Sequence, residues 1–135
     1  MIKGLSHITL IVENMERSSL FFTKVFGAKE IYASGDEGFS LAREKFYLLN
    51  DVWICVMQGC PPVERTYSHV AFRIDENDFD DYLARIIGIG AQIKEGRPRV
   101  LGEGRSIYFY DFDNHLFELH TGTLQERLTR YSQGR

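Results

Sequence analysis

Residues 6–16 read SHITLIVENME and residues 68–78 read SHVAFRIDEND, so one pattern occurs twice in the chain. In each copy a Ser-His pair opens a run of alternating apolar residues, and a Glu-Asn or Asp-Glu-Asn step follows it. Alternation with a period of two is typical of a strand with one buried face, and Asn is typical of a helix start. A repeat of this length indicates that a complete supersecondary unit is present twice.

After each copy the apolar residues recur at helical spacing. A first helix is expected to have Asn14 as its N-cap and to stop at Gly27. A second is expected with Asp78 in its first turn, an apolar stripe over 79–87 and its end at Gly88 and Gly90. A last helix is expected to begin at Thr123, the first residue of a TLQE capping box. The remaining short strands are expected at 29–33, 38–41, 44–49, 52–58, 92–94, 107–110 and 115–120, with hairpin turns at 50–51 and 113–114.

The order β-α-β-β-β, written twice, predicts an α+β fold. The two modules are expected at about 1–60 and 64–122, with a C-terminal helix at about 123–132. A chain of 135 residues fits one domain of ordinary size, so residues 1–135 are expected to form a single domain. Neither half-sheet can enclose a pocket alone, and together they are expected to form an open, barrel-like one.

Composition excludes several function classes. The net charge is −3 and no basic cluster occurs, so neither nucleic acid nor an anionic membrane surface is an expected partner. No apolar run approaches the ~18–20 residues that a membrane span needs, and no leader-like segment opens the sequence. Two cysteines, Cys55 and Cys60, do not make a disulfide framework and are expected to be thiols. A cytoplasmic location is expected.

Three potential metal ligands lie on the polar faces of expected strands. His7 and His69 occupy equivalent positions in the two copies, and Glu118 stands between apolar residues that face the other way. A carboxylate within an apolar strand is costly unless it is paired or bound to a metal, and two imidazoles with one carboxylate leave coordination positions open. The pattern alone leaves hydrogen-bonded structural histidines as the alternative. His115, in a turn, and His120, at a strand end, are interpreted as non-ligands.

The paired modules carrying His7, His69 and Glu118 resemble the vicinal oxygen chelate superfamily, which includes glyoxalase I and the extradiol dioxygenases. The resemblance covers essentially the whole chain, and several stretches make it specific to the fosfomycin-resistance hydrolases of that superfamily. These stretches are GLSHITL (4–10), REKF (43–46), ERTYSH (64–69), GEGRSIYFYD (102–111) and DNHLFELHTG (113–122).

The resemblance implies a Mn²⁺ ion bound by His7, His69 and Glu118, with other divalent metals as possible substitutes. It also implies a homodimer in which each site takes ligands from both chains. The substrate would be fosfomycin, a phosphonate epoxide, and Glu44 would be the base that activates water. The sequence pattern alone favours a different interpretation of Glu44, as a solvated residue between two basic neighbours.

The same resemblance implies a set of substrate-binding residues, namely Thr9, Trp53, Tyr67, Ser106, Tyr108 and Arg127. A planar guanidinium suits a phosphonate because it donates two parallel hydrogen bonds. Arg97 and Arg105 are expected to be surface charges, and the role of Arg99 is left open. Residues 101–106 include an arginine, unlike the K⁺-binding loop of the glutathione-type transferases, so bound K⁺ is not expected.

Three other functions are compatible with parts of this pattern. The first is transfer of a thiol, glutathione or bacillithiol, to fosfomycin, and Glu44 argues against it. The second is another metal-dependent enzyme of the superfamily, such as an Fe(II) dioxygenase or a glyoxalase-like isomerase, because two histidines and a carboxylate also suit non-haem iron. The third is a protein that binds the drug without chemistry, and the complete ligand set argues against it.

Overall fold

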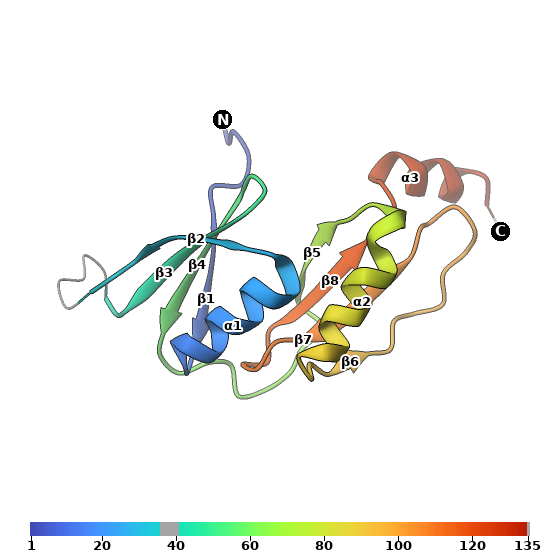
Figure 1. The fold of residues 1–135 in the computed structure, drawn as a ribbon. Coiled ribbons are helices and arrows are strands. Elements are labelled where there is room, and N and C mark those ends of the chain that lie inside the picture. Colours follow the sequence, from blue (N-terminus) through green and yellow to red (C-terminus); the bar gives the residue numbers. More distant parts are fainter. Residues whose placement is uncertain (36–40, 135) are drawn as a thin grey trace. The chain divides into compact units, whose positions relative to one another are not determined.

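The structure is a computed structural model that describes residues 1–35 and 41–134. Most of the strand expected at 38–41 lies outside the described residues; Leu41, its one described residue, is in a bend. The chain divides into two compact units, Met1–Arg65 with Phe112–His115, and Thr66–Asp111 with Leu116–Arg135. Each unit contains one four-stranded sheet (Figure 1).

The first unit has the expected order β-α-β-β-β. Its elements are β1 (Ile8–Val12), α1 (Met15–Phe26), β2 (Lys29–Ala33), β3 (Glu44–Leu49) and β4 (Val52–Gln58). The spatial order of the strands is β1-β4-β3-β2, with β1 parallel to β4 and the other pairs antiparallel. Asn50, at the β3–β4 turn, has a φ of 52°, a conformation that asparagine tolerates better than most residues.

The second unit repeats this arrangement. Its elements are β5 (His69–Arg73), the 3₁₀ helix η1 (Glu76–Asp78), α2 (Phe79–Gly88), β6 (Ile93–Lys94), β7 (Ser106–Tyr110), β8 (Leu116–His120) and α3 (Leu124–Ser132). The strand order is β5-β8-β7-β6, and β5 is again parallel to β8. The predicted α+β repeat is confirmed.

The helix ends follow the capping rules read from the sequence. The side chain of Asn14 accepts a hydrogen bond from the backbone N–H of Arg17 at 2.9 Å, and Gly27 ends α1 with a φ of 63°. Thr123 and Glu126 form a reciprocal capping box at the start of α3. All three helix ends satisfy backbone groups that a helix terminus otherwise leaves unpaired. No helix in the described parts of the chain is both long and apolar enough to cross a membrane.

Helix α1 covers one face of the first sheet. Phe22 stacks on Tyr47 with ring centroids 5.4 Å apart, and Ser19 forms a hydrogen bond with the Tyr47 hydroxyl at 2.5 Å. Tyr47 pairs in register with Ile54, and both side chains are fully buried. Because side chains alternate along a strand, the residues next to Tyr47 and Ile54 point to the opposite face of the sheet.

The second sheet has one apolar face and one polar face. Phe117 packs between Phe72 and Phe109, with ring centroids 6.2 and 6.0 Å away, which confirms the apolar face predicted for β5. Helix α2 runs along this sheet in Figure 1 and contributes the fully buried Ile86. Glu118, between Phe117 and Leu119, therefore points to the other face.

Candidate functional site

Glu44 is the first residue of β3 and is buried, with 8% of its surface exposed. Its side chain lies on the sheet face that α1 does not cover, whereas the next residue, Lys45, turns to the α1 side and donates to Ser19 at 2.8 Å. The Sγ atom of Cys55 donates to Oε2 of Glu44 at 3.6 Å. The sequence pattern alone predicted a solvated carboxylate here, and that interpretation is wrong because β3 directs Glu44 inward.

Cys55 and Thr9 share this face with Glu44. Cys55 pairs in register with Thr9 on the neighbouring strand. Burial and the adjacent Glu44 carboxylate raise the pKa of the Cys55 thiol. The side chain of Cys55 is therefore a neutral S–H group at neutral pH, and it can donate only weakly to Glu44.

His7 and Trp53 extend the same region. The two rings have centroids 4.3 Å apart, and Trp53 also packs edge-on against Phe46 at 5.1 Å. The Nδ1 atom of His7 lies 3.0 Å from the Ser6 hydroxyl, which leaves Nε2 as the ring nitrogen for a metal. Among the described residues, the buried Nε1 of Trp53 has no hydrogen-bond partner. The first unit thus presents an imidazole, an indole donor and a buried carboxylate.

On the polar face of the second sheet, Nε2 of His69 lies 3.0 Å from Oε1 of Glu118. The other ring nitrogen, Nδ1, lies 2.6 Å from the carbonyl oxygen of Tyr67 and donates to it. A neutral imidazole that donates through Nδ1 has a lone pair on Nε2, so two acceptors face each other. This arrangement needs a proton or a metal ion, and a carbonyl on the far nitrogen is the usual support of a metal-binding histidine.

The second oxygen of Glu118 is held by donors. Oε2 accepts from the Ser106 hydroxyl at 2.5 Å and from Nη2 of Arg99 at 3.2 Å. Burial raises the pKa of Glu118, but hydrogen bonds from Ser106 and Tyr108 and the charge of Arg99 outweigh it, so the net pKa lies below the ordinary value. Glu118 is therefore a carboxylate at neutral pH, with one oxygen fixed and the other directed at His69.

Arg99, whose role the sequence left open, lies in the cluster around Glu118. Its Nη2 also donates to the Tyr108 hydroxyl at 2.8 Å and to Ser106 at 3.0 Å. Its Nη1 is buried and has no hydrogen-bond partner among the described residues. Only its position beside a glycine-rich segment pointed to Arg99, because the side-chain direction of a loop residue follows no period.

Tyr67, Tyr108 and Arg127 complete the cluster. Tyr67 donates to the Tyr108 hydroxyl at 3.3 Å, and burial is the main reason that the pKa of Tyr108 is raised. Arg127, on α3, donates through Nη2 to Nε2 of His120 at 3.3 Å. Four of the predicted substrate residues, counting Ser106, therefore lie with Glu118 on one face.

His120 belongs to this cluster although the sequence placed it outside the ligand set. Its Nδ1 lies 2.7 Å from the Ser106 hydroxyl, and its Nε2 accepts from Arg127. Burial, followed by nearby positive charge, lowers the pKa of His120 below its ordinary value, although the Glu118 carboxylate opposes the change. Both ring nitrogens are engaged, so His120 supports the donors around Glu118. His115 lies in the turn that belongs to the first unit.

Arg105 fits the expectation of a surface charge. Its guanidinium pairs with Glu76 at 2.5 Å and lies over the ring of Phe79 at 3.8 Å, and half of its side chain is exposed. Arg97 is also exposed, at 43% of its side chain, although its guanidinium pairs with the buried carboxylate of Glu103 at 2.5 Å.

The predicted site residues thus form two groups, one in each unit. The first comprises His7, Thr9, Glu44 and Trp53, and the second comprises Tyr67, His69, Ser106, Tyr108, Glu118 and Arg127. Within each unit, the described residues contain no group of three His, Cys, Asp or Glu side chains that could hold a metal ion. The second unit brings together two of the three predicted ligands, and His7 belongs to the first.

The chain belongs to the Glyoxalase/Bleomycin resistance protein/Dioxygenase superfamily, whose family model matches residues 4–119. Within it, the chain is 59% identical to the fosfomycin resistance protein FosX of Listeria monocytogenes over 98% of this chain and 100% of that protein. FosX of Mesorhizobium japonicum is 57% identical over 99% of this chain and 96% of its own. The metallothiol transferase FosB of Staphylococcus epidermidis is more distant, at 34% over 100% of this chain and 95% of its own.

Solved structures agree with these sequence relationships. A crystal structure of a variant of Listeria monocytogenes FosX, complexed with Mn(II) and 1S,2S-dihydroxypropylphosphonic acid, has a TM-score of 0.89 and 55% identity over 97% of this chain and 99% of that one. The same FosX complexed with Mn(II) and sulfate has a TM-score of 0.88, with the same identity and coverage. The resemblance inferred from the sequence is confirmed.

Proposed function

We propose that this chain is a manganese-dependent hydrolase that opens the epoxide of fosfomycin with water to give the diol and so confers resistance. The observation that carries the proposal is the buried carboxylate of Glu44, which shares a sheet face with Thr9 and whose Oε2 accepts a hydrogen bond from Cys55. Similarity to FosX supports it, since a solved FosX contains Mn(II) and a dihydroxypropylphosphonic acid, the diol expected from this reaction.

His7, His69 and Glu118 would hold the manganese ion. Two observations support this set. Nε2 of His69 and Oε1 of Glu118, both acceptors, lie 3.0 Å apart. In His7, Nδ1 lies beside the Ser6 hydroxyl, so Nε2 is the nitrogen left to bind a metal. Imidazole and carboxylate donors suit a divalent first-row metal and leave positions for substrate oxygens. When bound, the ion acts as a Lewis acid that stabilises negative charge on the epoxide oxygen.

A two-fold dimer would complete the ligand set. His7 belongs to one compact unit, and His69 with Glu118 belongs to the other. We propose that each site takes His7 from one chain and the other two ligands from the second chain. Such an interface should be obligate and bury more than roughly 2,000 Å² in total.

Glu44 would act as the general base. Its Oε2 is held by the Cys55 thiol, so Oε1 is the oxygen that takes a proton from water. The water oxygen then bonds to an oxirane carbon while the carbon–oxygen bond of the ring breaks. The ring oxygen takes up a proton from solvent and becomes the second hydroxyl of the diol, and Glu44 releases its proton to solvent. Water needs such a base because it is a poor nucleophile, whereas a thiolate does not.

The donors around Glu118 would bind the phosphonate. Arg99 and Arg127 supply guanidinium groups, and Ser106, Tyr108 and Tyr67 supply hydroxyls on the same face. The remaining predicted contacts, Thr9 and Trp53, come from the first unit. A cluster of charge-assisted donors suits a phosphonate dianion. The proposed location of the protein, the cytoplasm, stays a prediction from composition.

Phosphorus NMR of fosfomycin with the protein and Mn²⁺ in H₂¹⁸O tests this function. The diol should appear without any thiol and should carry ¹⁸O on carbon. Turnover only after addition of glutathione or bacillithiol would identify a thiol transferase instead. Thiol transfer is the second candidate function because the chain is also similar to the metallothiol transferase FosB. Stoichiometric binding without turnover would contradict both.

A further inference from the structure

Glu103 is the most deeply buried carboxylate of the described residues, with 1% of its surface exposed. It lies in the loop between β6 and β7, outside the set of residues that contact the metal or the reacting atoms. Its side chain accepts from the backbone N–H of Val100 at 2.9 Å and from Nη1 and Nη2 of Arg97 at 3.2 and 2.5 Å. Such a set of donors offsets the cost of burying a charge.

Glu103 remains charged in the folded protein. The hydrogen bond from Arg97, followed by those from Val100 and Tyr131, holds the pKa of Glu103 far below its ordinary value. The same pairing raises the pKa of Arg97. This loop therefore encloses a negative charge at neutral pH.

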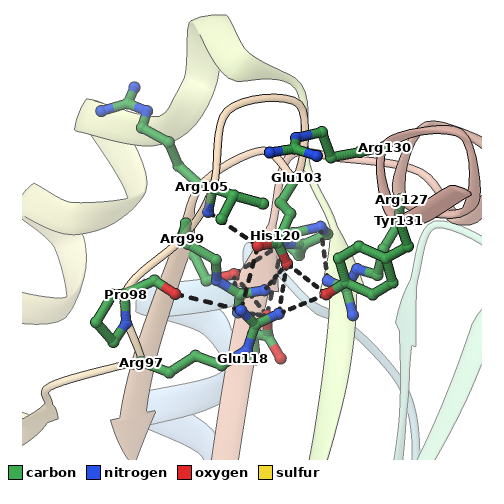
Figure 2. A network of polar contacts seen from close by, with 12 residues as sticks. Arg97, Pro98, Arg99, Glu103, Arg105, Glu118, His120, Arg127, Arg130 and Tyr131 are labelled. Atoms are coloured by element: carbon green, nitrogen blue, oxygen red, sulfur yellow. Dashed lines mark hydrogen bonds and ion pairs between the residues drawn. The ribbon is translucent and has the colours of Figure 1, made fainter. Parts of the chain in front are cut away.

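The buried carboxylate also binds the C-terminal helix. The Tyr131 hydroxyl, near the end of α3, donates to Oε2 of Glu103 at 2.7 Å, and Arg97 donates to the same hydroxyl at 3.2 Å. A third contact joins the two segments, because Nε of Arg130 donates to the carbonyl of Leu101 at 2.9 Å. Figure 2 shows Tyr131 and Arg97 meeting at Glu103.

Arg99 lies between two carboxylates. Its Nη1 is 3.6 Å from Oε2 of Glu103, and its Nη2 is 3.2 Å from Oε2 of Glu118. Since Nη1 has no hydrogen-bond partner among the described residues, the charge of Glu103 is the interaction that orients this end of the guanidinium. Loss of that charge would leave only Glu118 and its neighbours to orient Arg99.

We infer that Glu103 is a positioning residue for phosphonate binding, which fixes Arg99 directly and Arg127 through α3 before the substrate arrives. The inference rests on the proposed function, because it assumes that the phosphonate binds at these two guanidinium groups. Glu103 itself touches neither the substrate nor the metal. Groups held in place in advance lose less conformational entropy on binding, so the effect belongs to substrate affinity.

Glu103→Gln tests the inference, with Glu76→Gln as a matched control. Glu76 also pairs with an arginine at 2.5 Å, but both side chains of that pair are at least half exposed. In the Mn²⁺-loaded protein, Glu103→Gln should raise the Kd and KM for fosfomycin about 10- to 100-fold, the range for losing a hydrogen bond to a charged group, with a smaller change in kcat. Glu76→Gln should leave all three unchanged.

Hydrogen exchange gives a readout that does not depend on activity. The amide of Val100 and those of 124–132 should exchange faster in Glu103→Gln than in the parent. Tyr131→Phe keeps the charge but removes the bond to α3, so it should speed exchange in 124–132 and raise KM by a smaller factor. If Glu103→Gln does not fold, Tyr131→Phe is used for the test instead. Unchanged exchange rates and an unchanged KM in Tyr131→Phe would then overturn the inference.

Two results would overturn the inference in a folded Glu103→Gln protein. Faster exchange with unchanged Kd and KM would make Glu103 a purely structural residue, and unchanged exchange would remove the coupling to α3. If the parent does not hydrolyse fosfomycin, the proposed function fails separately. In that case inorganic phosphate replaces fosfomycin as the ligand in the titration. Weaker phosphate binding by Glu103→Gln than by the parent supports the inference, and equal binding contradicts it.

Discussion

Nε2 of His69 lies 3.0 Å from Oε1 of Glu118, on the parallel pair β5 and β8. The other nitrogen of His69 donates to a backbone carbonyl, and the other oxygen of Glu118 accepts from Ser106 and Arg99. Among the described residues, the two atoms that face each other are therefore the two for which no other hydrogen bond is seen. Because hydrogen bonds hold the other nitrogen of His69 and the other oxygen of Glu118, the two acceptors are oriented to bind one cation between them.

Glu118→Gln should weaken Mn²⁺ binding sharply. The substitution removes the negative charge and places either an amide N–H or a neutral oxygen opposite His69. We expect a loss of at least ~10- to 100-fold, the range observed when only a supporting partner of a metal ligand is changed. The electron paramagnetic resonance signal of free Mn²⁺ measures the Kd. Glu64→Gln, at an exposed position, is the control, and an unchanged Kd in Glu118→Gln would remove Glu118 from the ligand set.

Cys55→Ser should alter the pH dependence of hydrolysis. The Cys55 thiol is a weak donor to Oε2 of Glu44, and a serine hydroxyl at the same place is a stronger one. A stronger donor stabilises the charged carboxylate and makes it a weaker base. The acidic limb of the kcat profile should therefore move to lower pH, and the maximum kcat should fall. Cys60→Ser, at an exposed cysteine, should change neither, and an identical profile for both variants would show that Cys55 does not contact the base.

The fold was predictable because its signals are periodic. Alternating residues in the two copies, the Asn14 cap and the Thr123 capping box all depend on local chemistry, and each is confirmed. Strand ends are harder to predict, because pairing between strands can begin or end one residue away from the expected position. The strand expected at 115–120, for example, begins at Leu116. The separation of the site residues into two sheet faces follows from the same alternation.

Side chains in loops and at strand ends could not be assigned in this way. Arg99 and Glu103 belong to a loop whose conformation is set by contacts with β8 and α3, distant in the sequence. His120 looked peripheral because it ends a strand, but Ser106 and Arg127 enclose its ring. Burial of a polar group depends on several segments at once, so it cannot be predicted from any one short stretch of sequence.

Glu103 should make the stability of the protein depend on acid. The pKa of Glu103 is lower in the folded protein than the ordinary value of ~4.3, chiefly through the hydrogen bond from Arg97. Its stabilising effect is complete above the unfolded pKa and is lost as pH falls toward the folded pKa. Urea unfolding of the parent and Glu103→Gln should thus differ most at pH 7 and less at pH 3. A constant difference across that range would contradict this assignment.

Mixing two inactive variants should restore activity if each site is shared by two chains. A His7→Ala dimer and a Glu118→Ala dimer each lack a ligand at both sites. After subunit exchange, a mixed dimer has one site that takes His7 from the Glu118→Ala chain and Glu118 from the His7→Ala chain, and that site is complete. About a quarter of all sites should then be active if exchange is random. No recovery after verified exchange would place all three ligands within one chain.

Glu44→Gln should keep the fold, Mn²⁺ binding and fosfomycin binding but lose most of the hydrolysis. The amide fills the same buried space beside Cys55 and cannot take a proton from water. Removal of a general base typically costs ~10²- to 10⁴-fold in rate, and the loss should appear in kcat more than in KM because the base acts only in the chemical step. Phosphorus NMR measures the rate, and Glu16→Gln, at an exposed carboxylate on α1, is the control. If Glu44→Gln forms the diol as fast as the parent, then water is activated elsewhere, even if the metal site is correct.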